Sequence, residues 1–305
     1  MYILNKPIYI FKSKIPIQDA KKESFSPTKT IEENYKQALY KVAQEIDKQV
    51  KRQTKGKDIN IGKLIKLMKQ LRNYSDDLNN WAKKKAFDLV YMLNTDNKQK
   101  WRRHSKKISK GLRKVLEEDE YIKNLMKQYM NQNAELITSL PITAAKKVQK
   151  LILETYVTGE KRSEYLIPEI MKLGDMTKNR AKLIARTETA KIRSGLTQAR
   201  SLSIGNIWYI WRTSEDARVR SSHDIMQDVL VRWIDPPSPE ELDNQKTSYG
   251  HYHAGNIFNC RCYAEPVFEI DDIKFPAKVY MNGAIVNMTK KQFTNMYIND
   301  FREAA

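Results

Sequence analysis

Residues 208–262 read WYIWRTSEDARVRSSHDIMQDVLVRWIDPPSPEELDNQKTSYGHYHAGNIFNCRC. This stretch holds three of the five tryptophans, three of the four histidines and both cysteines of the chain. Because such side chains supply aromatic packing, acid–base groups and metal ligands, we expect a small folded module and the candidate site to lie here. Apolar residues in strand-like patterns predict strands over 207–212, 229–234 and 258–268.

Two further features define this module. Asp216 is placed to cap a short helix that ends at His223. Alternate residues of a strand share one face, so Cys260 and Cys262 are expected to point the same way from the third strand. After the module, Asn282-Gly283 predicts a β-hairpin, and a capped helix is expected to follow it.

The residues that precede the module predict a series of helices. Apolar side chains recur every three or four positions, and Thr30 with Glu33 forms a capping box at the first helix. We expect helices to begin or end at residues that cap or break them, namely Gly56, Ser75, Pro141, Gly159, Gly174, Thr177 and Gly205.

The predicted fold class is therefore α+β. An elongated helical N-terminal half is followed by a small mixed α/β C-terminal domain with a short antiparallel sheet. We predict four segments: an N-terminal arm over 1–28, a basic helical domain over 29–205, a small α+β module over 206–270, and a C-terminal hairpin and helix over 271–305.

Composition excludes several classes of protein. The chain has 305 residues, of which 41% are hydrophobic and 30% charged, and it contains no apolar run of the ~20 residues that cross a bilayer. The first residues are broken by Lys6, Pro7 and Lys12, so we expect a mature arm made in the cytoplasm rather than a signal peptide. Cysteines spaced as Cys-Arg-Cys rarely form a disulfide, which favours a reducing compartment.

Charge is unevenly distributed along the chain. Residues 206–280 hold 8 Lys or Arg against 12 Asp or Glu, so the net charge of +19 requires +23 elsewhere. The most basic run covers 98–114 and predicts binding to the phosphates of double-stranded DNA without sequence specificity, although such runs are often only solvated faces. The predicted DNA-binding residues are Trp101, Arg102, Arg103, Lys106, Lys107, Lys110, Arg113 and Lys114.

Three segments together resemble the phage Mu F-like minor head proteins, also called the phage head morphogenesis family. They are Ala185-Arg-Thr-Glu188, the run from Trp211 to His223, and Asn259-Cys-Arg-Cys262. The resemblance covers about residues 130–268, and DIMQDVLV stands where members often carry a glycine after the histidine motif. The signature positions here are Arg186, Thr187, Glu188, Asp216, Arg218, Arg220, His223, Cys260, Arg261 and Cys262.

The resemblance implies a minor structural protein of a tailed DNA phage, made in the host cytoplasm and placed inside the capsid near the portal. Its implied roles are head assembly, genome packaging or delivery. Its partners would be the portal protein, capsid or scaffolding proteins and double-stranded DNA. A free-standing DNA-binding regulator would need a compact reading helix in a dimeric frame, which the pattern lacks.

Charged signature residues predict a structural ion-pair network rather than an active site. Glu188 falls within the apolar face of the helix that precedes the module, where a lone charge is costly, and Arg218 and Arg220 are the nearest cations in sequence. Without a glycine-rich phosphate loop or a nucleophile elbow, we expect no enzyme activity. The network would fasten that helix to the small sheet, and it consists of Arg186, Glu188, Asp216, Arg218, Arg220 and Arg261.

The Cys and His residues could instead hold a structural zinc ion. The predicted ligands are His223, Cys260, Cys262 and His253, with His251 as an alternative to His253. The competing interpretation is a pair of half-buried thiols and histidines satisfied by hydrogen bonds. The alternative function is a metal-dependent hydrolase or nuclease that uses the His223, Cys260 and Cys262 cluster.

Overall fold

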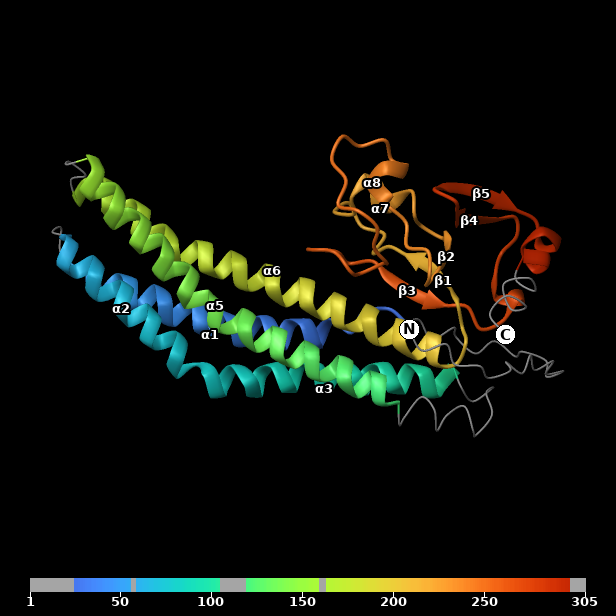
Figure 1. Cartoon of the computed structure of the whole chain (residues 1–305), viewed down its shortest axis with the longest axis horizontal. Coiled ribbons are helices and arrows are strands. Elements are labelled where there is room, and N and C mark those ends of the chain that lie inside the picture. Colours follow the sequence, from blue (N-terminus) through green and yellow to red (C-terminus); the bar gives the residue numbers. More distant parts are fainter. Residues whose placement is uncertain (1–24, 56–58, 105–118, 159–162, 297–305) are drawn as a thin grey trace. The chain divides into compact units, whose positions relative to one another are not determined.

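The computed structural model describes most of the chain (Figure 1). The described residues are 25–55, 59–104, 119–158 and 163–296. Among them, no helix is both long and apolar enough to span a membrane.

Contacts divide the chain into two compact units, each built from segments that are distant in sequence. The helical unit consists of Thr28–Leu93 and Leu125–Thr189. The sheet unit consists of Met1–Pro27, Asn94–Asn124 and Ala190–Ala305, of which the described residues are discussed. The four segments expected from the sequence remain a prediction.

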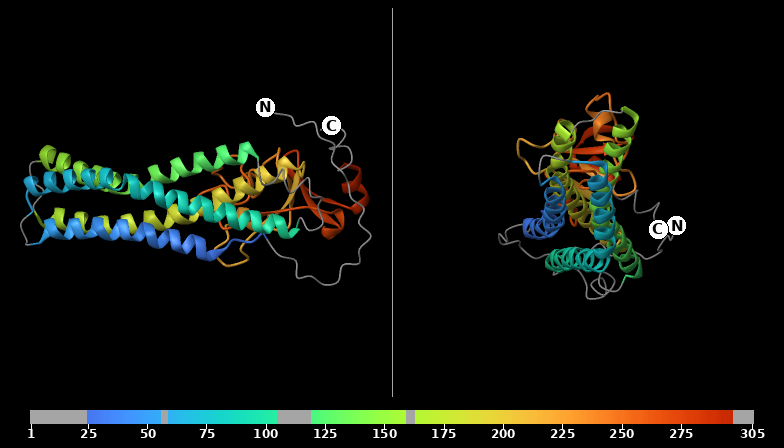
Figure 2. Two further views of the ribbon diagram at one scale, coloured as in Figure 1. Left: turned by 90° about the horizontal axis from the view of Figure 1, so that it is seen from below. Right: turned by 90° about the vertical axis from the view of Figure 1, so that its left-hand side faces the viewer.

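Long helices account for most of the described residues before 206. They are α1 (Lys29–Thr54), α2 (Ile61–Asp77), α3 (Asn79–His104), α5 (Glu120–Thr158) and α6 (Ser163–Ser203). Figure 2 shows them as long ribbons from two further sides.

The helical unit is held together by apolar faces with helical spacing. Each fully buried aliphatic side chain contributes about 1.5–3 kcal/mol, so this face supplies most of the stability of each helix. Buried residues on α1 and α2 include Leu39, Val42, Ile46, Leu64, Leu67 and Leu71.

Ser75 does not cap a helix, contrary to the sequence prediction. It lies inside α2, which continues to Asp77, and its hydroxyl donates to the carbonyl of Thr138 at 2.9 Å. The hydroxyl thus serves packing between helices, because a buried hydroxyl needs a partner.

Pro141 does not begin a helix either. It lies within α5, although a proline costs one backbone hydrogen bond and crowds the preceding turn. The buried residues Ile137, Leu140 and Ala144 form one continuous face across it, so packing outweighs that loss.

Gly174 and Thr177 do not separate two helices, because α6 is continuous through both. A Cβ atom at Gly174 would lie 2.5 Å from Oδ1 of Asp47 on α1, so glycine permits a close approach of the two helices. The hydroxyl of Thr177 donates back to the carbonyl of Leu173 at 2.7 Å, as it does in a helix interior.

The sheet unit contains a five-stranded sheet in the order β3-β1-β2-β4-β5. The strands are β1 (Trp208–Arg212), β2 (Leu230–Arg232), β3 (Tyr263–Pro266), β4 (Ala277–Met281) and β5 (Ala284–Met288). β1 pairs antiparallel with β2 and β3, and β4 pairs antiparallel with β5. The α+β fold class is therefore confirmed.

One strand pair differs from the predicted antiparallel sheet. β2 and β4 are parallel, with Leu230 opposite Val279. A parallel pair needs a long crossover connection, and here α8 (Pro239–Leu242), β3 and the 3-10 turn η2 (Ile270–Asp272) supply it.

Both faces of β1, which lies between β3 and β2, are buried. Tyr209 and Trp211 belong to one hydrophobic cluster, and Trp208 and Ile210 belong to another on alternate positions. Trp233 joins the first cluster, so the three tryptophans of the opening stretch are core residues.

The predicted hairpin and its following helix are present. Asn282 and Gly283 have φ angles of 51° and 78°, as a two-residue type I′ turn requires. The side-chain oxygen of Gln292 accepts from the Thr289 backbone and hydroxyl, both at 2.8 Å, and residues 290–296 are helical.

Candidate metal centre and its surroundings

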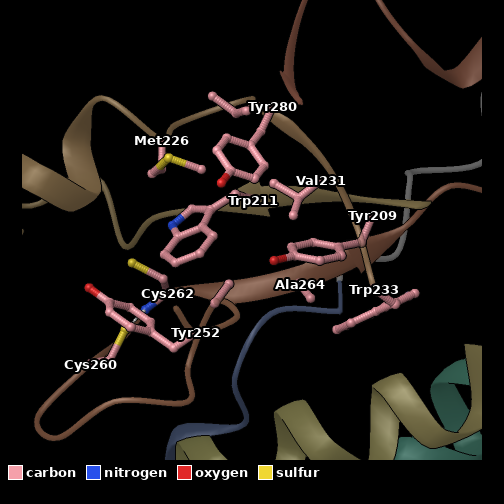
Figure 3. Close-up of a cluster of buried hydrophobic side chains, with 12 residues drawn as sticks. Tyr209, Trp211, Met226, Val231, Trp233, Tyr252, Cys260, Cys262, Ala264 and Tyr280 are labelled. Atoms are coloured by element: carbon pink, nitrogen blue, oxygen red, sulfur yellow. Dashed lines mark hydrogen bonds between the residues drawn. The ribbon is translucent and has the colours of Figure 1, made fainter. Parts of the chain in front are cut away.

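Three candidate metal ligands from two segments distant in sequence converge in the sheet unit. Nδ1 of His223 lies 3.6 Å from Sγ of Cys260 and 3.4 Å from Sγ of Cys262. All three ligand atoms lie within 4.8 Å of one another. Figure 3 shows both sulfur atoms beside the ring of Tyr252, in the aromatic cluster that also contains Trp211.

Local backbone structure places these ligands. His223 lies in α7 (Ser221–Asp224), while both cysteines lie in the turn before β3 rather than in the strand itself. Asn259 has a φ of 56°, a left-handed conformation that asparagine tolerates. The backbone N–H of Cys262 donates to Sγ of Cys260 at 3.4 Å, so the turn rather than a strand brings the two sulfurs together.

A hydrogen-bond chain determines the tautomer of a neutral His223 ring. The Tyr252 hydroxyl donates its only proton to the carboxylate of Glu240, at 2.7 and 2.9 Å from the two oxygens. The hydroxyl oxygen must then accept from Nε2–H of His223, 2.9 Å away. A neutral His223 therefore presents a bare Nδ1 to the two sulfurs.

The cluster is enclosed by protein. His223, Cys260 and Cys262 are 2%, 2% and 5% exposed, and Glu240 is 0% exposed. A hydrogen bond between the thiols lowers the pKa of Cys260, against the effect of burial, and raises the pKa of Cys262 in the same direction as burial.

His253 and His251 lie outside the group of three. Nδ1 of His253 is hydrogen-bonded to the Tyr209 hydroxyl, and Nε2 of His253 is hydrogen-bonded to the Trp233 carbonyl, both at 3.1 Å. Burial lowers the pKa of His253 to about 4, so it is neutral at pH 7. The exposed His251 bonds through Nδ1 to the Pro236 carbonyl at 2.9 Å.

Asp216 joins two of the predicted ion-pair residues. Both terminal nitrogens of Arg261 bond its carboxylate, one of them at 2.6 Å, in a bidentate pair. The backbone and side chain of Arg218 also donate to it, at 3.0 and 3.2 Å. These bonds, above all those of Arg261, hold the pKa of Asp216 well below its ordinary value.

Arg220 contacts the segment that leads to the cysteines. It donates to the Phe258 carbonyl at 2.9 Å, and its guanidinium lies 4.6 Å from the centre of the Phe258 ring. It thus supports the segment that leads to the cysteines.

The segments that contain His223 and the two cysteines lie within a region of the chain that matches a known protein family. Residues 146–265 match the protein family described as Phage Mu protein F like protein. The resemblance seen in the sequence is confirmed for these residues, which we call the Mu F-like region.

One relative extends this comparison. A protein of Haemophilus influenzae (strain ATCC 51907 / DSM 11121 / KW20 / Rd), named Uncharacterized protein, is 32% identical over 160 residues. These residues are 52% of this chain but 32% of that relative, so the match covers about a third of the relative's length. No solved structure matches the chain.

The first motif of the Mu F-like region lies in the helical unit. There Arg186 bonds Glu32 at 3.4 Å, and Asn133 donates to Glu188 at 3.4 Å. Asn133 also accepts from the Tyr35 hydroxyl at 3.0 Å, so Glu188 belongs to a buried polar group within this unit. The predicted pairing of Glu188 with Arg218 or Arg220 stays a prediction.

The proposed DNA-binding run precedes the Mu F-like region. Trp101 is 1% exposed and packs edge-on against Phe25 and Phe268, so its ring is not available to nucleic acid. Arg102 and Arg103 are exposed at the end of α3. The remaining residues of the set lie outside the described residues: Lys106, Lys107, Lys110, Arg113 and Lys114.

Sequence reasoning missed the buried partners of His223. Tyr252 lies beside the histidines in sequence, and Glu240 follows a proline-rich segment. Pro239 begins α8, which gives Glu240 its position, and Ser222 donates to that carboxylate at 3.0 Å. A proline followed by two acidic residues is a helix-start signal that could have indicated α8.

Proposed function

We propose that this chain is a minor structural protein of a tailed phage head that acts in head morphogenesis. The observation that carries the proposal is the match of residues 146–265 to the Phage Mu protein F like family. The folded module supports it, since it pairs Asp216 with Arg261 and places His223 against both cysteines, all of them motif residues.

The finer proposal places the protein inside the capsid near the portal. Its partners there would be the portal protein, capsid or scaffolding proteins and double-stranded DNA. The charge of +23 outside residues 206–280 supports contact with DNA phosphates. Since no base-reading motif accompanies this charge, the binding would be independent of sequence.

A structural role also fits the chemistry of the His and Cys cluster. Its three ligand residues are at most 5% exposed. A cavity lined in part by Cys262 has a volume of about 10 Å³, which is about the space of one water molecule. A nucleotide or peptide bond could not reach the sulfurs without local opening.

The second candidate is a metal-dependent hydrolase or nuclease. The convergence of His223, Cys260 and Cys262 favours it, since three protein ligands with an open position are typical of catalytic zinc. DNA cleavage assays with and without a chelator separate the candidates. Chelator-sensitive cleavage by wild-type protein would support the hydrolase, whereas DNA binding without cleavage supports the structural role.

Particle association tests the leading proposal. Phage particles carrying a tagged copy of this chain would be purified on a density gradient and treated with protease before mass spectrometry. We expect the tagged chain in the particle fraction, protected from protease by the capsid. Its absence from particles, with normal expression in the host, would overturn the proposal.

Salt dependence tests the DNA interface. Replacing exposed Arg102 and Arg103 by alanine should flatten the plot of log affinity against log salt by roughly two, because each phosphate contact contributes about 0.9 to the slope. The matched control replaces Lys83 and Lys84, two exposed lysines earlier in α3. Equal slopes for both variants would remove Arg102 and Arg103 from the interface.

A further inference from the structure

The two distances from His223 Nδ1 to the sulfurs of Cys260 and Cys262 match two edges of a zinc coordination tetrahedron. Typical Zn–S and Zn–N distances are about 2.3 and 2.0–2.1 Å, so tetrahedral geometry separates nitrogen from sulfur by about 3.6 Å. The measured separations of His223 Nδ1 from the two sulfurs are 3.6 and 3.4 Å. The side chains therefore need little movement to take up a metal ion.

Hydrogen bonding alone accounts less well for this convergence. Nδ1 of a neutral imidazole has one lone pair and accepts one good hydrogen bond. Two sulfurs from different positions of one turn nevertheless lie at bonding distance from the same nitrogen. A metal ion at the centre of the three atoms would satisfy the nitrogen and both sulfurs together.

The surroundings of the imidazole are those of a metal ligand. Metal-binding histidines usually donate their second N–H to an acceptor that fixes the tautomer and the ring orientation. Here Nε2 donates to Tyr252, which donates to the fully buried carboxylate of Glu240. Trp211 packs edge-on against the His223 ring at 5.6 Å and limits its rotation.

We propose that Nδ1 of His223 and the Sγ atoms of Cys260 and Cys262 bind one zinc ion. Two thiolates and an imidazole are a soft ligand set that suits Zn²⁺ and disfavours Mg²⁺ and Ca²⁺. Both thiols lose their protons to solvent as the ion binds. Two thiolates neutralise the charge of Zn²⁺, which makes burial of the ion less costly.

The proposed site has three protein ligands rather than the four expected from the sequence. Both nitrogens of His253 are occupied by Tyr209 and Trp233. Within the described part of the chain, the ligand group contains His223, Cys260 and Cys262 alone. Water or another small ligand completes the coordination, and the site is independent of whether the chain acts in a phage head.

Metal analysis of the full chain tests the site. Wild-type protein, purified without added zinc and dialysed, should contain one zinc per chain by elemental analysis. After removal of zinc by a chelator, added Co²⁺ should give a thiolate-to-cobalt charge-transfer band. Cys262→Ser and His223→Gln should each lose most of the zinc, whereas His253→Gln and His251→Gln should keep it.

Folding is monitored separately so that each outcome is decisive. If Cys262→Ser fails to fold, the cobalt titration of the chelated wild-type protein decides. Folded wild-type protein with less than about a tenth of an equivalent of zinc and no cobalt band would overturn the site. Full zinc content in both ligand variants, or bound copper in place of zinc, would overturn it as well.

Discussion

The Tyr252 hydroxyl donates to the Glu240 carboxylate at 2.7 Å, and both residues are buried: Tyr252 is 6% exposed and Glu240 is 0% exposed. A buried carboxylate is tolerated only when hydrogen-bond donors satisfy it, so this bond stabilises the folded structure around α8. It also determines which nitrogen of His223 faces the cysteines.

Replacing Tyr252 by Phe should therefore destabilise the protein by about 1–3 kcal/mol, because Glu240 loses a donor and His223 an acceptor. Urea unfolding followed by circular dichroism measures the change. Tyr249→Phe is the matched control, since Tyr249 is 51% exposed. Equal losses in the two variants would contradict the role assigned to the Tyr252 hydroxyl.

Asn133 has the corresponding role in the helical unit. It is 0% exposed, donates to Glu188 and accepts from Tyr35. Asn133→Leu should cost about 2–3 kcal/mol, because Glu188 and Tyr35 each lose one buried hydrogen bond. Asn131→Leu on the exposed side of α5 should change the unfolding free energy by less than about 0.5 kcal/mol.

The lowered pKa of Asp216 predicts that the stability of the protein depends on pH in the acid range. The pKa of Asp216 is lowered below the ordinary value of 3.8, chiefly by Arg261. Asp216 is therefore ionised at neutral pH in both the folded and the unfolded protein, and its pairing with Arg261 stabilises the folded state. As pH falls from 3.8 through the lower folded pKa, the unfolded state takes up the proton first and this contribution is lost. The stability difference between wild type and Asp216→Asn should thus be constant at neutral pH and shrink below about pH 4.

A surface pair provides the control for Asp216. Asp271 bonds Lys290 at 2.6 Å with 78% of its side chain exposed. The difference between wild type and Asp271→Asn should be small throughout, since exposed pairs contribute little. A larger acid-sensitive effect at Asp271 than at Asp216 would refute the assignment.

The lowered pKa of His253 predicts a second pH range, above that of Asp216, in which the stability of the protein changes. Its folded pKa is lowered by burial from 6.5 to about 4, so below pH 6.5 the unfolded state binds the proton more readily. Between pH 6.5 and 4 the wild type should lose up to about 3 kcal/mol from this group, and His253→Gln should lack that part of the slope. His251→Gln, the same change at an exposed histidine, is the matched control for the substitution.

The sequence predicted the fold class and most strands because strand alternation and the Asn282-Gly283 turn are local signals. It failed at Ser75, Pro141 and Gly174, where a local helix-breaking preference is overridden by packing between helices. Those contacts join residues far apart in sequence, such as Gly174 with Asp47.

The site was predictable in its residue types but not in its grouping. The sequence predicted His223, Cys260 and Cys262 as metal ligands, and the structure brings these three side chains together. His253 was included because it lies near them in sequence, but its ring bonds Tyr209 and Trp233 instead. Spacing along a loop does not define which way a ring points, so only three-dimensional structure separates His253 from His223.

The strand order has a consequence for synthesis of the chain. β1 and β2 leave the ribosome first, β3 then covers the free side of β1, and β2 stays uncovered until the β4 hairpin has been translated. An open strand edge invites pairing with other chains. A chain truncated just after β3, near residue 266, would therefore leave the β2 edge unpaired, whereas β4 pairs with that edge in the full chain.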